Sequence, residues 1–370
     1  MVKIDKKFWK RFDFLLLLTV FALSIYGFIM IKSATTSLPA GSERYVNRQI
    51  LSFVMGLVVM VILIFIDYEA YGKFYIPIYV VCNVMLLAVL VFGFGEDQWG
   101  ARRWLSIGPL VFQPSEIVKF GLILSLSKFI DLHKEEINKP MTLIKILIFA
   151  GFPIGLIIIQ PDFGTGMVFV FFIVAMLFAA GLNVKYFLLF LAIGIIMIPI
   201  LAMTLENYQL DRIRVFLDPS LDPLDTGYQV TQSKLAIGSG LMYGRGLFQG
   251  VQNQYGFLPA KQTDFIFAVI GEELGFFGGT ALILLYTLLM YRLIRIAKYA
   301  QDLFGSMIVI GITAMMLFHI FENIGMTMGL TPVTGLPLPF ISYGGTFMII
   351  NMISIGLVLS VAVKREGLEF

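Results

Sequence analysis

Apolar segments long enough to cross a lipid bilayer recur along the whole chain, and short polar stretches separate most of them. A helix needs roughly 20 apolar residues to cross about 30 Å of hydrocarbon. The pattern yields about ten such segments, of which the fourth and fifth are short: 12–32, 48–66, 74–93, 114–130, 143–160, 163–181, 186–203, 265–291, 304–328 and 343–363. We therefore predict an all-α polytopic membrane protein in which residues 1–370 form a single domain.

The distribution of basic residues predicts the orientation of these segments. Lys and Arg precede the first segment and also follow the fourth, the eighth and the last. Short cytoplasmic loops carry an excess of Lys and Arg, so we expect both termini in the cytoplasm and an even number of spans. The first apolar segment is too long for the core of a cleaved signal peptide, so we interpret it as a membrane anchor.

Composition narrows the classes of site that the chain can build. Hydrophobic residues make up 58% of the sequence and charged residues 14%, with a net charge of +3. The single cysteine, Cys82, excludes an internal disulfide and a thiolate metal site. His133 and His319 fall on opposite sides of the predicted topology, so no His-based metal site is expected. The sequence has no basic tract that resembles a nucleic-acid-binding stripe, and we expect no nucleic-acid partner.

The longest polar segment, 204–264, lies between the seventh and eighth apolar segments. In the predicted topology it is an extracytoplasmic loop, and its many Pro and Gly residues indicate turns rather than long helices. Loops of this length inside compact folds are commonly functional. A disordered connector is the alternative, although the Tyr, Phe and Leu residues of the loop argue against it. We expect the loop to roof a site.

Asp264 ends this loop, where the chain enters the eighth apolar segment. An ionisable group at the edge of a membrane costs several kcal/mol unless it is paired, hydrated or used. Asp264 is therefore the first candidate for chemistry.

A second polar group lies around the start of the fourth segment. Glu116 and Lys119 are three residues apart, so one helix face can carry both. They form either a structural ion pair or a polar wall of a substrate cavity, and the two roles are compatible. Arg102 and Arg103 precede Trp104 and serve either as an interface anchor or to capture a phosphate.

Three further motifs contain polar residues inside or between apolar segments. Asp162 follows Pro161 and is best explained as the cap of the next helix. Glu272 and Glu273 form a carboxylate pair for which a structural and a functional role are equally plausible. The segment 342–346, at the N-terminus of the last span, can present amide donors to an anion.

Taken together, these motifs resemble the SEDS family of bacterial shape, elongation, division and sporulation proteins, over nearly the whole chain. Segment 232–240 is most similar to the elongation branch, the RodA proteins, with a sporulation paralogue as the alternative. The matching motifs are Gly100–Trp104, Gln113–Glu116 with Lys119, Gln160–Thr165, Thr263–Phe267, Glu272–Gly275 and Pro332–Thr346.

The resemblance implies a peptidoglycan glycosyltransferase of the bacterial cytoplasmic membrane, with its active site facing outward. Such an enzyme polymerises lipid II into a glycan strand during cell-wall elongation and works with a class B penicillin-binding protein, a transpeptidase. The essential aspartate of the family falls on Asp264, and its buried ion pair falls on Glu116 and Lys119.

In this interpretation Asp264 is the general base. The departing pyrophosphate would be bound by cationic side chains on the outer side, with Arg102, Arg103 and Arg212 favoured. A divalent cation, Mg²⁺ or Mn²⁺, is the other candidate. The full set of expected substrate-binding residues is Arg102, Arg103, Gln113, Glu116, Lys119, Asp162, Arg212, Lys234, Lys261, Ser342, Gly344 and Gly345.

The chain departs from the family pattern at two places. Lys261 and Gln262 stand where many relatives carry His or Arg, so no histidine can assist the base there. Phe347 stands where relatives often have a small residue. Two other functions remain open. One is a lipid II flippase, because the buried polar pair and the broken helices would also suit a transport path. The other is a non-catalytic scaffold for the transpeptidase. The long polar loop and Asp264 lie on a single side of the predicted membrane, which favours the enzyme over the flippase.

Overall fold

The computed structural model describes residues 6–38, 41–95, 102–108, 110–204 and 214–364. Every apolar segment predicted from the sequence coincides with a helix. These helices are α2 (Phe14–Thr35), α3 (Ser42–Phe65), α5 (Tyr75–Phe92), α7 (Pro114–Leu132), α8 (Pro140–Ile159), α9 (Phe163–Ala179), α10 (Val184–Thr204), α14 (Ile266–Lys298), α15 (Leu303–Met328) and α16 (Gly345–Lys364).

Shorter elements complete the described chain. They are α1 (Lys6–Arg11), α4 (Tyr68–Gly72), α12 (Thr226–Ser239), α13 (Val251–Gln254), the 3₁₀ turns Lys134–Glu136 and Pro219–Leu221, and an antiparallel hairpin of β1 (Leu105–Ile107) and β2 (Leu110–Phe112). The chain is thus mostly helical, as predicted.

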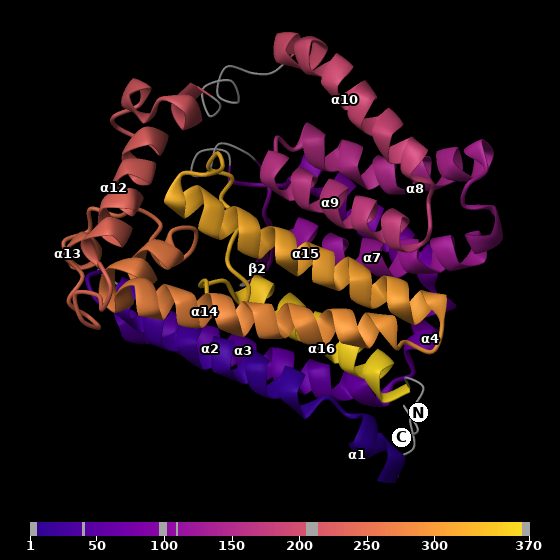
Figure 1. Ribbon diagram of the computed structural model, residues 1–370, viewed down its shortest axis with the longest axis horizontal. Coiled ribbons are helices and arrows are strands. Elements are labelled where there is room, and N and C mark those ends of the chain that lie inside the picture. Colours follow the sequence, from indigo (N-terminus) through magenta and orange to yellow (C-terminus); the bar gives the residue numbers. More distant parts are fainter. Residues whose placement is uncertain (1–5, 39–40, 96–101, 109, 205–213, 365–370) are drawn as a thin grey trace.

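The protein is a multi-pass membrane protein. Among the described residues, 7 helices are long and apolar enough to cross a bilayer. The helix α9 is shorter, and α7 carries two Lys and two acidic residues, which lower its hydropathy. The count of ten spans and the cytoplasmic position of both termini remain predictions. Figure 1 places α1 and the end of α16 at the same end of the bundle, where the two helices are in contact.

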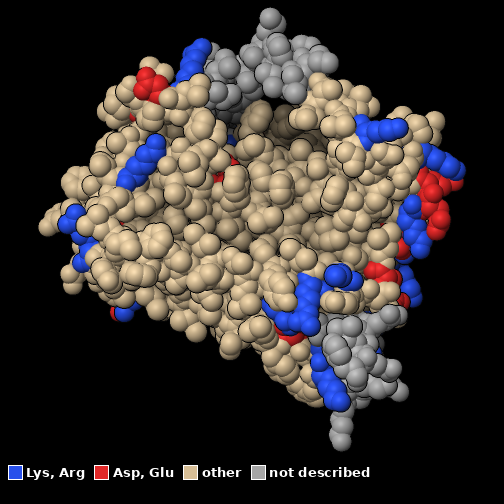
Figure 2. Space-filling model, viewed as in Figure 1, with Lys and Arg blue, Asp and Glu red and all other residues tan. Residues whose placement is uncertain are grey.

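The helix α15 runs through the middle of the bundle, with α9 and α7 on one side and α14 on the other (Figure 1). The helix α16 packs along α3, and α2 packs along α14. Of the candidate spans, α15 and α16 are the most buried. The helix α10 diverges from the bundle (Figure 1). Figure 2 shows charged side chains gathered at the margins of the molecule, which leaves a broad band with few charges for contact with lipid.

The described part of loop 204–264 has turns and bends at 219–225 and from 240, as predicted, but a helix at 226–239, where the prediction of turns was wrong. The helix α12 spans 14 residues of that loop. Asp222 accepts a hydrogen bond from the first amide of α12, Thr226 N, at 2.8 Å. Ser233 then ties the helix to α15 by donating to the Thr327 carbonyl at 2.7 Å. Packing on α14 and α15 stabilises α12 in a stretch whose flanks are rich in turn residues.

The helix α14 is interrupted at Gly275, whose φ of 63° is left-handed. The loop 240–246 fills the interruption, since Arg245 N donates to the Glu272 carbonyl at 2.9 Å and Gly246 N donates to the Glu273 carbonyl at 3.0 Å. A Cβ atom at Gly244 would lie 2.1 Å from the Glu273 carbonyl oxygen, so only glycine fits there. The described part of loop 204–264 is therefore docked onto the first turns of α14, the helix that follows Asp264.

Candidate active site

Asp264 lies two residues before α14 and is partly exposed. Gly335, in the irregular stretch between α15 and α16, faces its side chain: a Cβ atom there would lie 3.4 Å from Asp264 Oδ2. The bare glycine therefore leaves space beside the carboxylate. Among the described residues, no ion pair is recorded for this carboxylate. It is thus an acidic group without a fixed counter-charge in the part of the chain that the structure describes.

Loss of hydration raises the pKa of the Asp264 carboxyl from 3.8 to about 6. The neighbouring Thr263 side chain, a hydrogen-bond donor to the ionised form, partly offsets this rise. A carboxylate with a pKa near 6 is still ionised at neutral pH, but it accepts a proton more readily than an ordinary aspartate. The environment of Asp264 therefore suits a general base.

The backbone that carries Asp264 is held at three consecutive carbonyl groups. All three accept hydrogen bonds from α15 or from the segment that precedes α16. The pairs are Gln262 O with Tyr343 N at 2.8 Å, Thr263 O with Ser342 Oγ at 2.6 Å and Asp264 O with Asn323 Nδ2 at 2.8 Å. The C-terminal third of the chain thus fixes the position of the candidate base.

Ser342, Gly344 and Gly345 were predicted to offer donors to an anion. The Ser342 hydroxyl instead donates to the Thr263 carbonyl, and Gly344 N donates to Gln49 Oε1 at 3.0 Å. A Cβ atom at Gly345 would lie 3.1 Å from Ser52 Oγ, so this glycine allows α16 to approach α3. The observed contacts give these residues a structural role, and an anion-binding role remains a prediction.

Glu116 and Lys119 form the expected buried ion pair, with 2.8 Å between Lys119 Nζ and Glu116 Oε1. The structure adds a third member, His319 on α15, whose Nε2 lies 2.9 Å from Lys119 Nζ. An ammonium group can only donate, so Nε2 must accept and the ring proton sits on Nδ1. That proton is donated to the Pro337 carbonyl at 3.1 Å. Sequence reasoning had considered His319 only as a metal ligand.

Asp162 caps α9, as predicted: its Oδ1 accepts a hydrogen bond from Thr165 N at 3.3 Å. Two other predicted site residues converge on it. Gln113 Nε2 donates to Asp162 Oδ2 at 3.3 Å. Arg103 Nη1 lies 3.5 Å from Asp162 Oδ1, and Arg103 Nη2 donates to the Pro161 carbonyl at 2.6 Å. Arg102 is exposed beside this cluster.

The segment between α15 and α16 connects the Asp162 cluster with Asp264. A Cβ atom at Gly164, in the first turn of α9, would lie 2.9 Å from the Thr334 carbonyl oxygen. The next residue, Gly335, faces Asp264. Thr334 Oγ1 also donates to the buried Glu322 at 3.1 Å. Glu322 was not among the residues predicted from the sequence, although its position within an apolar helix was an available signal.

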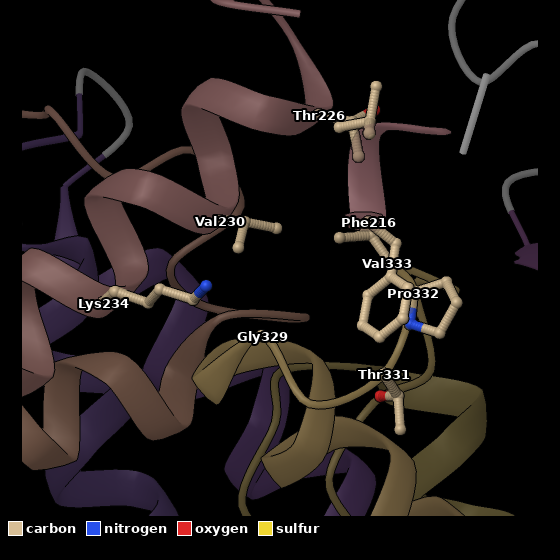
Figure 3. Close-up of a pocket in the computed structure, with 9 residues that line it drawn as sticks. Phe216, Thr226, Val230, Lys234, Gly329, Thr331, Pro332 and Val333 are labelled. Carbon is tan, nitrogen blue, oxygen red and sulfur yellow. The ribbon is translucent and has the colours of Figure 1, made fainter. Parts of the chain in front are cut away.

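The remaining predicted cations differ in their surroundings. Lys234 is exposed on α12 and points across Gly329 towards a small groove (Figure 3). Lys261 is buried, and its ammonium donates to Ser37 Oγ at 2.6 Å and to the Asn253 carbonyl. Burial lowers the pKa of Lys261. Arg212 lies outside the described residues. The groove beside Lys234 is lined by Val215, Phe216, Thr226, Val230, Gly329, Thr331, Pro332 and Val333.

Glu272 and Glu273 are fully buried and bind the described part of loop 204–264. All of their recorded partners are donors from α2 or from residues 248–253. Glu272 accepts from Gln252 N at 2.7 Å and Asn253 N at 3.0 Å, and Glu273 from Phe248 N at 3.0 Å, Asn253 Nδ2 at 2.8 Å and Ser33 Oγ at 2.6 Å. Of the two roles left open by the sequence, these contacts favour the structural one.

Within the described ranges, no group of three or more His, Cys, Asp or Glu side chains could hold a metal ion. The polar side chains that contact Asp264 or the adjacent backbone include Asn323, Thr263 and Ser342, which do not make a cage for a divalent cation.

The fold and the site define a polytopic membrane protein. It carries a carboxylate at the end of loop 204–264, held by an irregular segment between its last two helices. The family model of cell cycle proteins that covers FtsW, RodA and SpoVE matches residues 13–367. The chain belongs to this family.

Relatives and solved structures agree with this assignment. The chain is 38% identical to peptidoglycan glycosyltransferase MrdB of Escherichia coli, covering 98% of this chain and 97% of that protein. It is 36% identical to stage V sporulation protein E of Bacillus subtilis, over 95% and 96% of the two chains. RodA, the rod shape-determining protein of Thermus thermophilus, superposes with a TM-score of 0.73 at 29% identity, over 97% and 99%.

A second solved structure shows a chain of this fold within an assembly. That structure concerns the coordination of polymerization and crosslinking by a peptidoglycan synthase complex. The matching chain has a TM-score of 0.83 at 31% identity, over 95% of this chain and 97% of that one.

Proposed function

We propose that this protein is a peptidoglycan glycosyltransferase that polymerises lipid II into glycan strands on the outer face of the cytoplasmic membrane during cell-wall elongation. The observation that carries the proposal is Asp264, a carboxylate with a raised pKa beside an open glycine at the base of the outer loop. Relatives at 33–38% identity over nearly the whole chain are named peptidoglycan glycosyltransferases, which supports the same activity here.

In the proposed reaction, the 4-hydroxyl of the acceptor sugar attacks C1 of the donor sugar. Asp264 takes the hydroxyl proton as the new C–O bond forms, and the lipid pyrophosphate leaves with the electrons of the broken C–O bond. General-base assistance of this kind typically contributes about 10²–10⁴-fold to the rate. The Gly335 side of Asp264 is where the acceptor hydroxyl would lie.

The leaving pyrophosphate needs positive charge. We assign this role to Arg102, Arg103 and Arg212, of which Arg103 already lies at the Asp162 cluster. Lys261 is held by internal oxygen atoms and is a weaker candidate. A divalent cation, Mg²⁺ or Mn²⁺, would enter with the pyrophosphate as part of the substrate. Figure 2 shows the molecule hollowed between α12 and α10, and we place the head group of lipid II there.

The proposed partner is a class B penicillin-binding protein, which would cross-link the strands that this chain makes. The likeness to a chain of a peptidoglycan synthase complex supports such a partner. The outward orientation of the site rests on the distribution of Lys and Arg.

Two assays on one preparation test the proposed function against the flippase alternative. The purified protein, fused to its transpeptidase partner, is given labelled lipid II, and the products are separated on a gel. The same protein in sealed liposomes is tested for movement of labelled lipid II between leaflets. We expect a glycan ladder. Leaflet exchange without a ladder would replace the enzyme by the flippase.

The polymerisation rate is expected to rise with pH through about 6, the pKa of the Asp264 carboxyl. A general base acts only when it is deprotonated, so protonation below this pH removes activity. Initial rates of glycan formation between about pH 4.5 and 8, a range that brackets the expected transition, measure this dependence of the rate on pH. A rate that stays constant down to pH 4.5 would show that Asp264 does not titrate as the base.

A further inference from the structure

The stretch between α15 and α16 has no regular secondary structure from 332 to 338, and Leu336 and Leu338 within it are buried. Backbone groups at such a depth need partners, and side chains supply them. Leu336 O accepts from Asn323 Nδ2 at 2.8 Å, Pro337 O accepts from His319 Nδ1 at 3.1 Å, and Leu338 N donates to Ser342 Oγ at 2.8 Å. His319 and Asn323 are one helical turn apart, so the same face of α15 holds two consecutive carbonyl groups.

Asn323 makes a second contact that His319 does not make. Its Nδ2 also donates to the Asp264 carbonyl, again at 2.8 Å. Both partners are carbonyl oxygens, so only the NH₂ end of the amide can satisfy them. Asn323 is fully buried, and its Oδ1 has no hydrogen-bond partner among the described residues. The two donated bonds therefore define the orientation of the amide.

The two carbonyl groups that Asn323 binds, those of Asp264 and Leu336, flank the space beside the Asp264 carboxylate. One is that of Asp264 itself, and the other follows Gly335, which faces the Asp264 carboxylate. We propose that Asn323 is a positioning residue for Asp264: its single amide group sets the distance between the base and the segment against which the acceptor sugar docks. This inference rests on the proposed glycosyltransferase function.

The other two bonds to this loop do not duplicate the role of Asn323. Tyr343 N and Ser342 Oγ hold the carbonyls of the two preceding residues. They fix the loop against the segment that precedes α16, whereas Asn323 is the one described residue that joins the backbone of Asp264 to α15. Because misplacement of a catalytic group by about 1 Å can cost about 100-fold in rate, loss of this bond should act on turnover rather than on substrate binding.

The test compares Asn323→Ala, Asn323→Ser and a matched control, Asn351→Ala. Asn351 is also a buried asparagine on a spanning helix, but its amide donates only to the Phe347 carbonyl of its own helix, at 2.9 Å. We expect Asn323→Ala to lower kcat for lipid II polymerisation by about 100-fold, with KM changed by less than about threefold. Asn323→Ser retains one hydrogen-bond donor, so its kcat should be about tenfold higher than that of Asn323→Ala. The control should keep kcat within about threefold of the wild type.

Melting temperatures of the purified proteins show which variants are folded. If Asn323→Ala does not fold, Asn323→Ser decides, with an expected loss in kcat of about tenfold. A folded Asn323 variant with wild-type kcat would overturn the inference and leave the proposed function intact. An equal loss of kcat in Asn351→Ala would also overturn it, because the effect would then be general. A wild-type protein that makes no polymer would remove the proposed function and this inference together.

Discussion

Asp264→Asn is expected to lower the rate of glycan polymerisation by at least about 100-fold, while lipid II still binds. Asparagine has nearly the same size and keeps the backbone carbonyl that accepts from Asn323, but its amide cannot take a proton from the acceptor hydroxyl. Initial rates with labelled lipid II measure the loss, and equilibrium binding of the same substrate shows that the site is still formed.

The matched control is Asp218→Asn, in the same loop, 204–264. Asp218 is exposed and caps the short turn at Pro219–Leu221, where its Oδ1 accepts from Ser220 N at 3.0 Å. Asparagine caps as well as aspartate, so this variant should polymerise at the wild-type rate. Equal losses in both variants would point to a general effect of charge in the loop, and no loss in Asp264→Asn would remove Asp264 from catalysis.

Lys119→Met is expected to destabilise the protein by about 3–5 kcal/mol. The change leaves the Glu116 carboxylate buried without its cation and removes the donor to His319 Nε2. Thermal unfolding in detergent measures the effect as a lower melting temperature. The double variant Glu116→Gln with Lys119→Met should recover much of the loss, because no unpaired charge is then buried.

The helix α7 offers an internal control for this prediction. Lys128 and Asp131 have the same spacing as Glu116 and Lys119, but their side chains are 28% and 20% exposed. Ion pairs in contact with water contribute about 1 kcal/mol or less, so Lys128→Met should change the melting temperature little. Similar shifts in Lys119→Met and Lys128→Met would contradict the account of the buried pair.

The spanning helices could be predicted from the sequence because their signal is local. A run of apolar residues in a membrane protein has to satisfy its own backbone, and a helix does this within the segment. The cap at Asp162 and the pair of Glu116 and Lys119 were predicted for the same reason, since both depend on residues three apart in sequence. The helix α12 was missed because its stability comes from packing on α14 and α15.

The polar network around Asp264 could not be predicted in the same way. Asn323 and His319 bind carbonyl groups in an irregular segment, and no spacing rule relates a side chain to such a partner. The buried position of Lys261, bonded to Ser37 on the α2 side of the loop, likewise depends on contacts between distant parts of the chain. Candidate chemistry was thus visible in the sequence, whereas the residues that position it became visible only in the fold.

The most direct test of the central claim is a side-by-side gel of the products that wild type and Asp264→Asn make from the same lipid II. The account predicts a ladder of glycan strands from the wild type and none from a folded Asp264→Asn that still binds lipid II. Ladders of equal intensity from both proteins would contradict the assignment of Asp264 as the base of a glycosyltransferase.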